Sequence, residues 1–174
     1  PTGRGEDIRS VYRALRSVGM PARVVDIYRI QSPDADLRDE LADCLGQNAG
    51  TGVNIYHING DEVEQSLAHL EAGERLRQGA YNIVYPAWEL SRYPSGWARQ
   101  LDRFDEVWAP SKFVYESIAG EVKAPVIHMP LPSEVRILRP LDRRHFGISD
   151  GRFVFLFFFD FTSFVERKNP FAAL

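Results

Sequence analysis

The sequence predicts an α/β protein with a Rossmann-like, mostly parallel sheet that carries helices on both faces. Short apolar runs of strand length alternate with segments in which apolar residues recur at helical spacing. The run at residues 153–159 is apolar throughout, which is typical of a parallel strand that is buried on both faces. These two patterns favour an open parallel sheet built from successive strand–helix units.

The first helix is predicted over residues 8–18, because their apolar side chains share one face and Gly19 follows in the position of a C-terminal cap. A strand is expected at residues 22–27 and a second helix at residues 37–45. Further strands are expected at residues 53–56, 81–85, 106–109 and 126–129. Further helices are expected at residues 61–72 with Asp61 as cap, at residues 97–101 as a short turn, and at residues 111–118 with Ser111 as cap.

The pattern divides the chain into three parts. Residues 1–132 form the first Rossmann-like domain, and residues 133–150 form a linker with a basic cluster, Arg143-Arg144-His145, and no strong periodicity. Residues 151–174 begin a second domain with a central strand, and Pro170 is expected at the first position of its next helix.

Composition excludes several functional classes. Lys and Arg number 21 against 24 Asp and Glu, so the net charge of −3 lacks the basic excess of a nucleic-acid-binding protein. Cys44 is the only cysteine, which excludes an internal disulfide and a cysteine-rich zinc site. No apolar run approaches the roughly 20 residues that span a bilayer. The four histidines lack metal-ligand spacing, so no metal site is expected.

Two glycines and two cations stand where a phosphate could bind. Gly3 and Gly5 belong to a short turn that opens the first helix, whose unpaired N–H groups favour an anion. Arg167 and Lys168 lie just before a predicted helix start and could cradle a diphosphate. The alternatives are a flexible chain end for the glycines and an ordinary exposed basic pair for the cations.

Two further loops follow the carboxyl ends of predicted strands, where open α/β sheets bind ligands. His57 and Asn59 could act as a base or as hydrogen-bonding groups for a substrate, although a lone histidine is more often structural. Trp88 and Glu89 could face a carbohydrate, because aromatic rings pack on sugar C–H edges and carboxylates bind sugar hydroxyls. The alternative is a core tryptophan beside a solvated carboxylate.

Several segments resemble the family-4 (group 1) retaining glycosyltransferases of bacteria, which have the GT-B fold. The most specific is Asp-Glu-Val-Trp-Ala-Pro-Ser-Lys-Phe at residues 105–113. The others are Gly-Arg-Gly-Glu-Asp at residues 3–7 with Arg9, Val-Asn-Ile-Tyr-His-Ile-Asn at residues 53–59, Trp-Glu-Leu at residues 88–90 with Pro94 and Trp97, and residues 155–160 with Glu-Arg-Lys-Asn-Pro at residues 166–170.

The resemblance implies transfer of a sugar from a nucleotide-diphosphate donor to a glycan or lipid-linked acceptor, as in polysaccharide biosynthesis, with retained configuration. It implies no metal and no other cofactor. Lys168, assisted by Arg167, would contact the diphosphate, and Gly3 and Gly5 would approach it from the other side. The acceptor would meet four residues of the first domain, which are His57, Asn59, Trp88 and Glu89.

The resemblance assigns no catalytic residue, because in such enzymes the leaving diphosphate is thought to deprotonate the acceptor while the protein positions and stabilises charge. It implies a cytoplasmic protein that can associate peripherally with the inner face of the membrane. Many relatives carry a catalytic-loop histidine where this chain has residues 86–89.

Two parts of the family pattern are absent from the chain: the paired glutamates of the second domain, and the first strand, which would precede Pro1. The chain is therefore expected to be a transferase fragment that is inactive by itself. Because that first strand is central, its absence predicts unpaired backbone on both sides. Residues 153–159 could fill the position, within the chain or from a neighbour, which would lead to strand-mediated self-association.

Two other functional classes remain alternatives. The first is a non-catalytic binding or assembly module derived from a glycosyltransferase domain. The second is a nicotinamide-dependent oxidoreductase, which is disfavoured because the chain has no Gly-x-Gly-x-x-Gly motif.

Overall fold

The computed structural model describes residues 3–27, 41–46, 52–70, 79–133, 139–159 and 165–173. The chain divides into two compact units, Pro1–Glu134 and Val135–Leu174. All described strands belong to the first unit, and the second contains a short helix α6 (Val165–Lys168) and a 3-10 helix η1 (Pro170–Ala173). The boundary falls inside the predicted linker, and η1 begins at Pro170 where a helix was expected.

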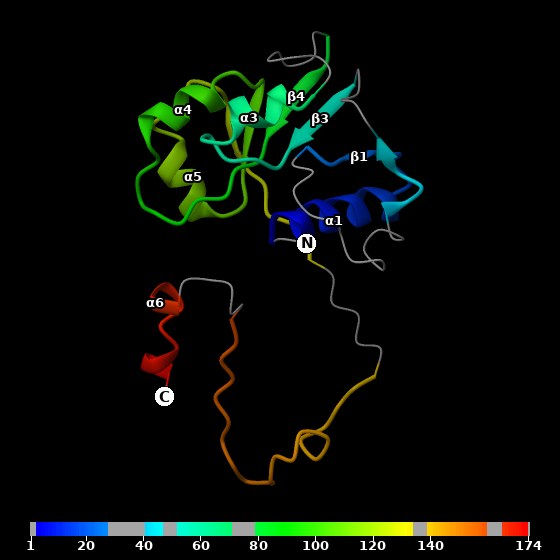
Figure 1. Ribbon diagram of the computed structural model, residues 1–174, viewed down its shortest axis with the longest axis vertical. Coiled ribbons are helices and arrows are strands. Elements are labelled where there is room, and N and C mark those ends of the chain that lie inside the picture. The colour runs from blue at the N-terminus through cyan, green and yellow to red at the C-terminus, as the bar shows by residue number, and fades with distance from the viewer. Residues whose placement is uncertain are drawn as a thin grey trace. The chain divides into compact units, whose positions relative to one another are not determined.

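The first unit is built on a parallel sheet, which confirms the predicted α/β class (Figure 1). Four strands pair in chain order, all parallel: β3 (Val53–Tyr56), β4 (Tyr81–Val84), β5 (Glu106–Ala109) and β6 (Val126–His128). A separate parallel pair consists of β1 (Val24–Val25) and β2 (Leu45–Gly46). Because all pairs are parallel, the carboxyl ends of β3 to β6 lie along one edge of the sheet.

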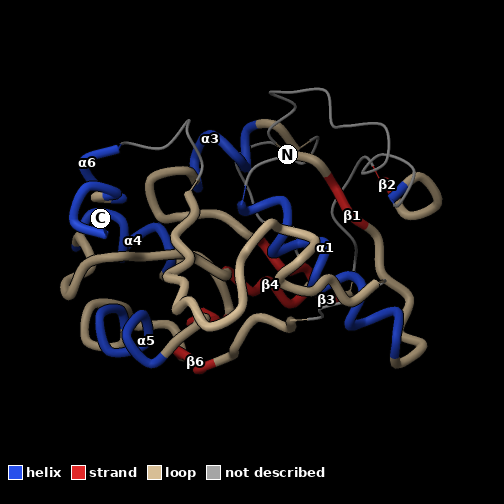
Figure 2. The backbone as a smooth tube through the Cα atoms, turned by 90° about the horizontal axis from the view of Figure 1, so that it is seen from below, coloured by secondary structure: helices blue, strands red, loops and turns tan. Residues whose placement is uncertain are grey.

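Helices flank this sheet. They are α1 (Gly3–Ser17), α3 (Val63–Ala68), α4 (Ser95–Leu101) and α5 (Lys112–Ile118). The last three connect successive strands of the four-stranded sheet, and Figures 1 and 2 show them gathered beside it. None of the described helices is long and apolar enough to cross a membrane.

Local sequence signals set two of the helix ends as predicted. Gly19 adopts a positive φ of 73° after α1, and the N–H groups of Met20 and Gly19 bond the carbonyls of Leu15 at 2.9 Å and Arg16 at 3.0 Å. This is the Schellman arrangement, in which glycine avoids the strain of a left-handed residue. At the start of α5, Ser111 Oγ accepts a hydrogen bond from the N–H of Val114 at 3.2 Å.

Three expected elements differ from the structure. Asp61 is not the cap of α3: the helix starts after Glu62, whose side chain makes no capping bond. Leu45 lies in β2, where pairing with Val24 overrides its helical periodicity, and residues 37–40 of the expected second helix lie outside the described residues. The strand expected at residues 22–27 is limited to Val24–Val25.

The largest correction concerns residues 153–159. They form no strand, and Phe153, Phe155, Leu156 and Phe158 are each more than 80% exposed. A strand needs a neighbour to pair its N–H and C=O groups, and the described part of the second unit contains no other strand. The expectation of a central strand at residues 153–159 is therefore wrong for the described structure.

The core of the first unit lies between the sheet and α3, α4 and α5. Its fully buried side chains come from the strands, from the loop after β3 and from the inward faces of these helices, and they include Ile58, Val63, Leu67, Val84, Leu101, Val107 and Ile118. Trp88 and Trp97 pack partly buried against this cluster. The core therefore lies directly beside the loops that follow β3 and β4.

The cap of α5 gives a test of the fold. We expect Ser111→Ala to lower the free energy of unfolding by about 0.5–2 kcal/mol, because the N–H of Val114 loses its acceptor. Urea unfolding followed by circular dichroism measures the change. Ser95→Ala is the matched control, because Ser95 is exposed at the start of α4 and the cap position there is Pro94. Equal losses in both variants would contradict the capping role.

Candidate functional site

The first turn of α1 is joined to the carboxyl edge of the sheet by Arg4. Its Nη2 donates a hydrogen bond to the carbonyl of Tyr85 at 2.5 Å, directly after β4. Its Nη1 lies 3.2 Å from Asp7 Oδ2 on the same helix. One guanidinium therefore connects the helix start with the residue at which β4 ends, although these lie 81 residues apart.

Gly3 and Gly5 lie in this first turn, inside α1 rather than in a loop before it. The first N–H groups of a helix have no partner within the helix and carry the positive end of its dipole. A Cβ on Gly5 would meet Arg9 Nη1 at 3.3 Å, so the turn is closely packed there. Arg9 is itself held by Glu6 at 2.6 Å. The helix start thus combines free donors with the Arg4 cation.

His57 lies beside this helix start, directly after β3. It is only 5% exposed, and its ring centroid lies 5.0 Å from that of Tyr85. Burial, together with the nearby charge of Arg4, lowers the pKa of His57 from 6.5 to about 3. The imidazole is therefore neutral at physiological pH. Its Nδ1 is buried without a hydrogen-bond partner, as is Arg4 Nε.

Asn59 connects the loops that follow β3 and β4. Its Oδ1 accepts a hydrogen bond from the N–H of Ala87 at 2.9 Å, and its own N–H donates to Glu62 Oε2 at 2.7 Å. Both contacts are internal to the first unit. The side-chain oxygen of Asn59 is therefore engaged in fixing the loop geometry. Contact of Asn59 with a sugar-accepting substrate remains a prediction.

Glycine is required at position 60 because the loop after β3 packs closely against Trp97 of α4. A Cβ at this position would lie 2.6 Å from Trp97 Cβ and 2.7 Å from the Trp97 carbonyl oxygen. Its N–H donates to the hydroxyl of Tyr93 at 3.1 Å. The contact with α4 therefore leaves no room for a side chain at this position.

Trp88 belongs to a cluster of three aromatic rings. Its ring centroid lies 5.0 Å from Tyr93 and 5.4 Å from Trp97, both in edge-to-face geometry. Trp88 Nε1 donates to the carbonyl of Arg92 at 3.0 Å. Trp88 is half-buried and Glu89 is exposed. The rings of this cluster thus pack against one another, as in the alternative of a core tryptophan beside a solvated carboxylate. Part of the Trp88 surface is nevertheless exposed at the loop.

The second unit is described by itself. Lys168 is half-buried at the end of α6, and the Arg167 side chain lies outside the described residues. The structure brings His57 and the glycine turn together through Arg4 and Tyr85, and it brings Asn59 and Trp88 into the adjoining loops. A diphosphate cradle shared with Lys168 remains a prediction.

Arg4 and Tyr85 are the residues that sequence reasoning missed at this site. An arginine between two glycines at a helix start was a signal for Arg4, because it places a cation among free N–H groups. Tyr85 could be expected only as a strand residue. In the structure it is buried and its hydroxyl donates to the carbonyl of Met129, so it spans the edge from β4 to the end of β6.

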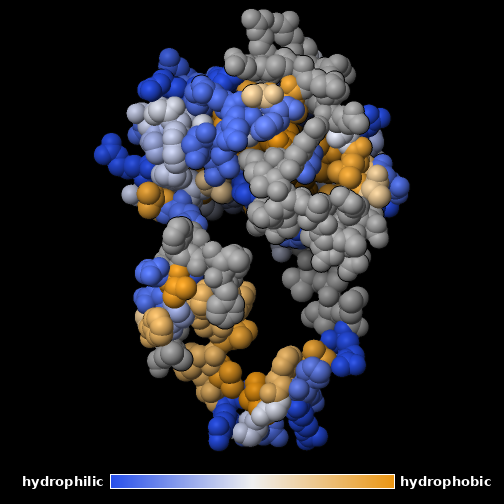
Figure 3. Space-filling view, viewed as in Figure 1, coloured by the Kyte–Doolittle hydropathy of each residue, from blue (hydrophilic) through white to orange (hydrophobic). Residues whose placement is uncertain are grey.

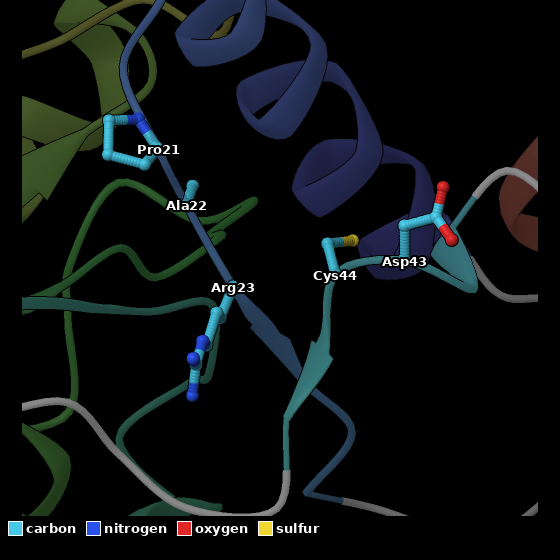
Figure 4. A pocket seen from close by; sticks show the side chains of 5 residues that line it. All are labelled: Pro21, Ala22, Arg23, Asp43 and Cys44. Carbon is cyan, nitrogen blue, oxygen red and sulfur yellow. The ribbon is translucent and has the colours of Figure 1, made fainter.

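A second concave region lies apart from these loops and is lined by Pro21, Ala22, Arg23, Asp43 and Cys44, with a volume of about 280 Å³. Figure 4 shows that the Arg23 and Asp43 side chains point away from each other rather than converging on a ligand. The buried Cys44 thiol donates to the carbonyl of Leu41 at 3.2 Å. Within the described ranges, no group of three or more His, Cys, Asp or Glu residues could hold a metal ion.

The buried histidine predicts a specific acid sensitivity. Folded His57 stays neutral down to about pH 3, whereas the unfolded chain takes up a proton near 6.5. Its contribution to stability is therefore fully present above pH 6.5 and decreases as the pH falls, by about 1.4 kcal/mol per pH unit at most. We expect His57→Phe, which keeps an aromatic ring against Tyr85, to flatten urea-derived stability between pH 6.5 and 3. An unchanged slope in His57→Phe, or an equal flattening in the exposed-site control His69→Gln, would refute this assignment.

Gly60 gives a packing test. We expect Gly60→Ala to lower the free energy of unfolding by about 1–3 kcal/mol, because the added methyl group overlaps the Trp97 backbone. Chemical denaturation followed by tryptophan fluorescence measures the loss. Gly120→Ala is the control, since a Cβ there meets nothing within 4 Å. Tolerance of alanine at position 60 would show that the loop and α4 are not in this contact.

Comparisons with protein-family models, with curated proteins and with solved structures found no match for this chain. Its function is therefore inferred from the residues and the geometry described above.

Proposed function

We propose that the first unit is the acceptor-side domain of a retaining GT-B glycosyltransferase. The reaction transfers a sugar from a nucleotide-diphosphate sugar to a glycan or lipid-linked acceptor, without a metal. The observation that carries the proposal is the Arg4–Tyr85 contact, which holds the glycine-containing start of α1 at the carboxyl edge of a parallel sheet.

This edge suits an anionic ligand. Open α/β sheets bind ligands beyond the carboxyl ends of their strands, and a helix start offers free N–H groups to phosphate oxygens. Arg4 adds a guanidinium, whose planar donors match phosphate oxygens in pairs. The Arg4 side chain is 21% exposed, so it can contact a ligand while its Nη2 holds the Tyr85 carbonyl. A diphosphate therefore fits this position in charge and in hydrogen bonding.

The state of His57 supports a transfer that needs no protein base. With a pKa of about 3, the imidazole is a very weak base at neutral pH. It suits the role of a neutral hydrogen-bonding group that orients a substrate. In the proposed reaction the acceptor proton passes to the departing diphosphate, and Arg4 with the α1 N–H groups stabilises the charge on that leaving group.

The acceptor would bind along the loop that contains Trp88 and Glu89. The half-buried indole offers an apolar edge to a sugar ring, and the exposed carboxylate can accept hydrogen bonds from sugar hydroxyls. Asn59 acts as a positioning residue, because its bond to Ala87 fixes this loop relative to His57.

Nucleotide binding tests the proposal. We expect isothermal titration calorimetry to detect binding of at least one common nucleoside diphosphate, such as UDP or GDP, and much weaker binding of the matching nucleoside. Arg4→Ala should weaken the diphosphate complex about tenfold or more, equivalent to about 1.4 kcal/mol. Arg99→Ala, which removes an exposed arginine on α4, is the control for net charge. Circular dichroism verifies that both variants are folded.

Two results would count against the proposal: no nucleoside diphosphate binds, or the nucleoside binds as well as its diphosphate. Diphosphate binding without turnover of any nucleotide sugar in the full-length protein would instead favour the non-catalytic module.

A further inference from the structure

One edge of the four-stranded sheet has no strand partner among the described residues. Among the described residues β3 pairs with β4 alone, through bonds to the carbonyls of Gly52 and Tyr56. Alternate residues of a strand direct their N–H and C=O groups to opposite neighbours, so those of Val53 and Ile55 point away from β4. This edge is a template for another strand.

Apolar surface elsewhere in the first unit is also incompletely covered. The apolar stripe of α1, formed by Ile8, Val11, Tyr12 and Leu15, is only half-buried. Both residues of β1 are half-buried, and Val53 is 64% exposed. Three elements of one unit thus have apolar surface that is not fully covered. A strand added beside β3 would be buried on both faces of the sheet. Such a strand needs apolar side chains on both of its own faces.

Residues 153–159 have these properties. Their side chains alternate between two faces, and both faces are apolar. The segment is already extended, since rings two residues apart touch: Phe153 and Phe155 at 4.8 Å, and Phe157 and Phe159 at 5.6 Å between centroids. Four of its side chains are more than 80% exposed, and Figure 3 shows hydrophobic colours along this part of the second unit.

We propose that residues 153–159 of one copy of this chain add as a strand to the open edge of β3 in a second copy. The exchange is reciprocal, which closes the assembly as a two-fold dimer. The added strand bonds the N–H and C=O groups of Val53 and Ile55 and directs its alternate side chains to the two faces of the sheet. This is β-strand addition between copies.

The size of the contact is sufficient for a dimer. Seven residues extend over about 23 Å, longer than the roughly 13 Å of a four-residue strand. Each buried aromatic side chain removes about 150–250 Å² from water, so the three most exposed phenylalanines, Phe153, Phe155 and Phe158, contribute roughly 450 Å² or more per copy. Reciprocal exchange doubles this to about 900 Å², and Leu156 and the covered surface of the acceptor edge add to it. Stable specific interfaces bury about 1,200–2,000 Å² in total.

The molar mass in solution tests the proposal. We expect size-exclusion chromatography with light scattering to give twice the mass of one chain across a dilution series. Phe155→Asp and Phe158→Asp place a charge on one face or the other of the segment and should each give monomers. Phe171→Asp is the matched control, because Phe171 is 79% exposed but lies in η1 outside the segment, and it should stay dimeric.

The acceptor edge is tested separately. Val53→Pro removes the N–H group that points away from β4 and should shift the equilibrium to monomer, whereas Val53→Thr keeps that group and should remain dimeric. Hydrogen exchange measures whether the backbone of residues 153–159 is protected, and circular dichroism verifies that the first unit of each variant is folded.

A monomer that protects residues 153–159 would overturn the proposal in favour of addition within one chain, and a monomer that leaves them unprotected would overturn it outright. A dimer that survives both Asp substitutions would place the interface elsewhere. Polydisperse aggregates in place of a dimer would show non-specific association and equally contradict it.

Discussion

The hydrogen bond from Arg4 to the Tyr85 carbonyl is the contact on which the candidate site depends. The apolar stripe of α1 is only half-buried, and Arg9 is the one α1 residue whose described side chain is buried. The contact therefore fixes where the free N–H groups of α1 lie relative to the strand ends. Burial lowers the pKa of His57 most, and the Arg4 charge adds to this effect, so the side chain that positions the helix start also contributes to the neutral state of the histidine beside it.

The loops after β3 and β4 form a single assembly. Asn59 bonds the backbone of Ala87, and Gly60 bonds the hydroxyl of Tyr93 and packs on Trp97. These contacts join residues of different loops, and the one from Gly60 to Tyr93 is buried, so the two loops stabilise each other. Residues that were expected to touch a substrate thus have a first role in giving the loops a fixed form.

Sequence patterns predicted the four-stranded sheet closely, because its strands combine apolar alternation with clear turn signals. The strands at residues 53–56 and 106–109 have the predicted bounds, and Ser111 and Gly19 set helix ends by local chemistry that needs no distant partner. Prediction failed where long-range pairing decides the outcome. Leu45 was assigned to a helix, yet pairing with β1 places it in a strand. Residues 153–159 have strand composition, but composition does not supply a neighbouring strand.

At the site, the glycine turn and His57 were recognisable by type and position, whereas the contact between Arg4 and Tyr85 spans 81 residues and leaves no local signature.

The contact between Gly60 and Trp97 gives the site an intrinsic optical reporter. A Cβ added at Gly60 would lie 2.6 Å from Trp97 Cβ, so the backbone of Gly60 packs directly on Trp97. The loop after β3 therefore cannot shift without displacing α4 or changing the environment of the indole. Trp97 also touches Trp88, so a small displacement near His57 alters two emitting rings in contact with each other. A ligand that binds at the carboxyl ends of the strands and displaces these loops would thereby change the tryptophan fluorescence of the chain, without any added label.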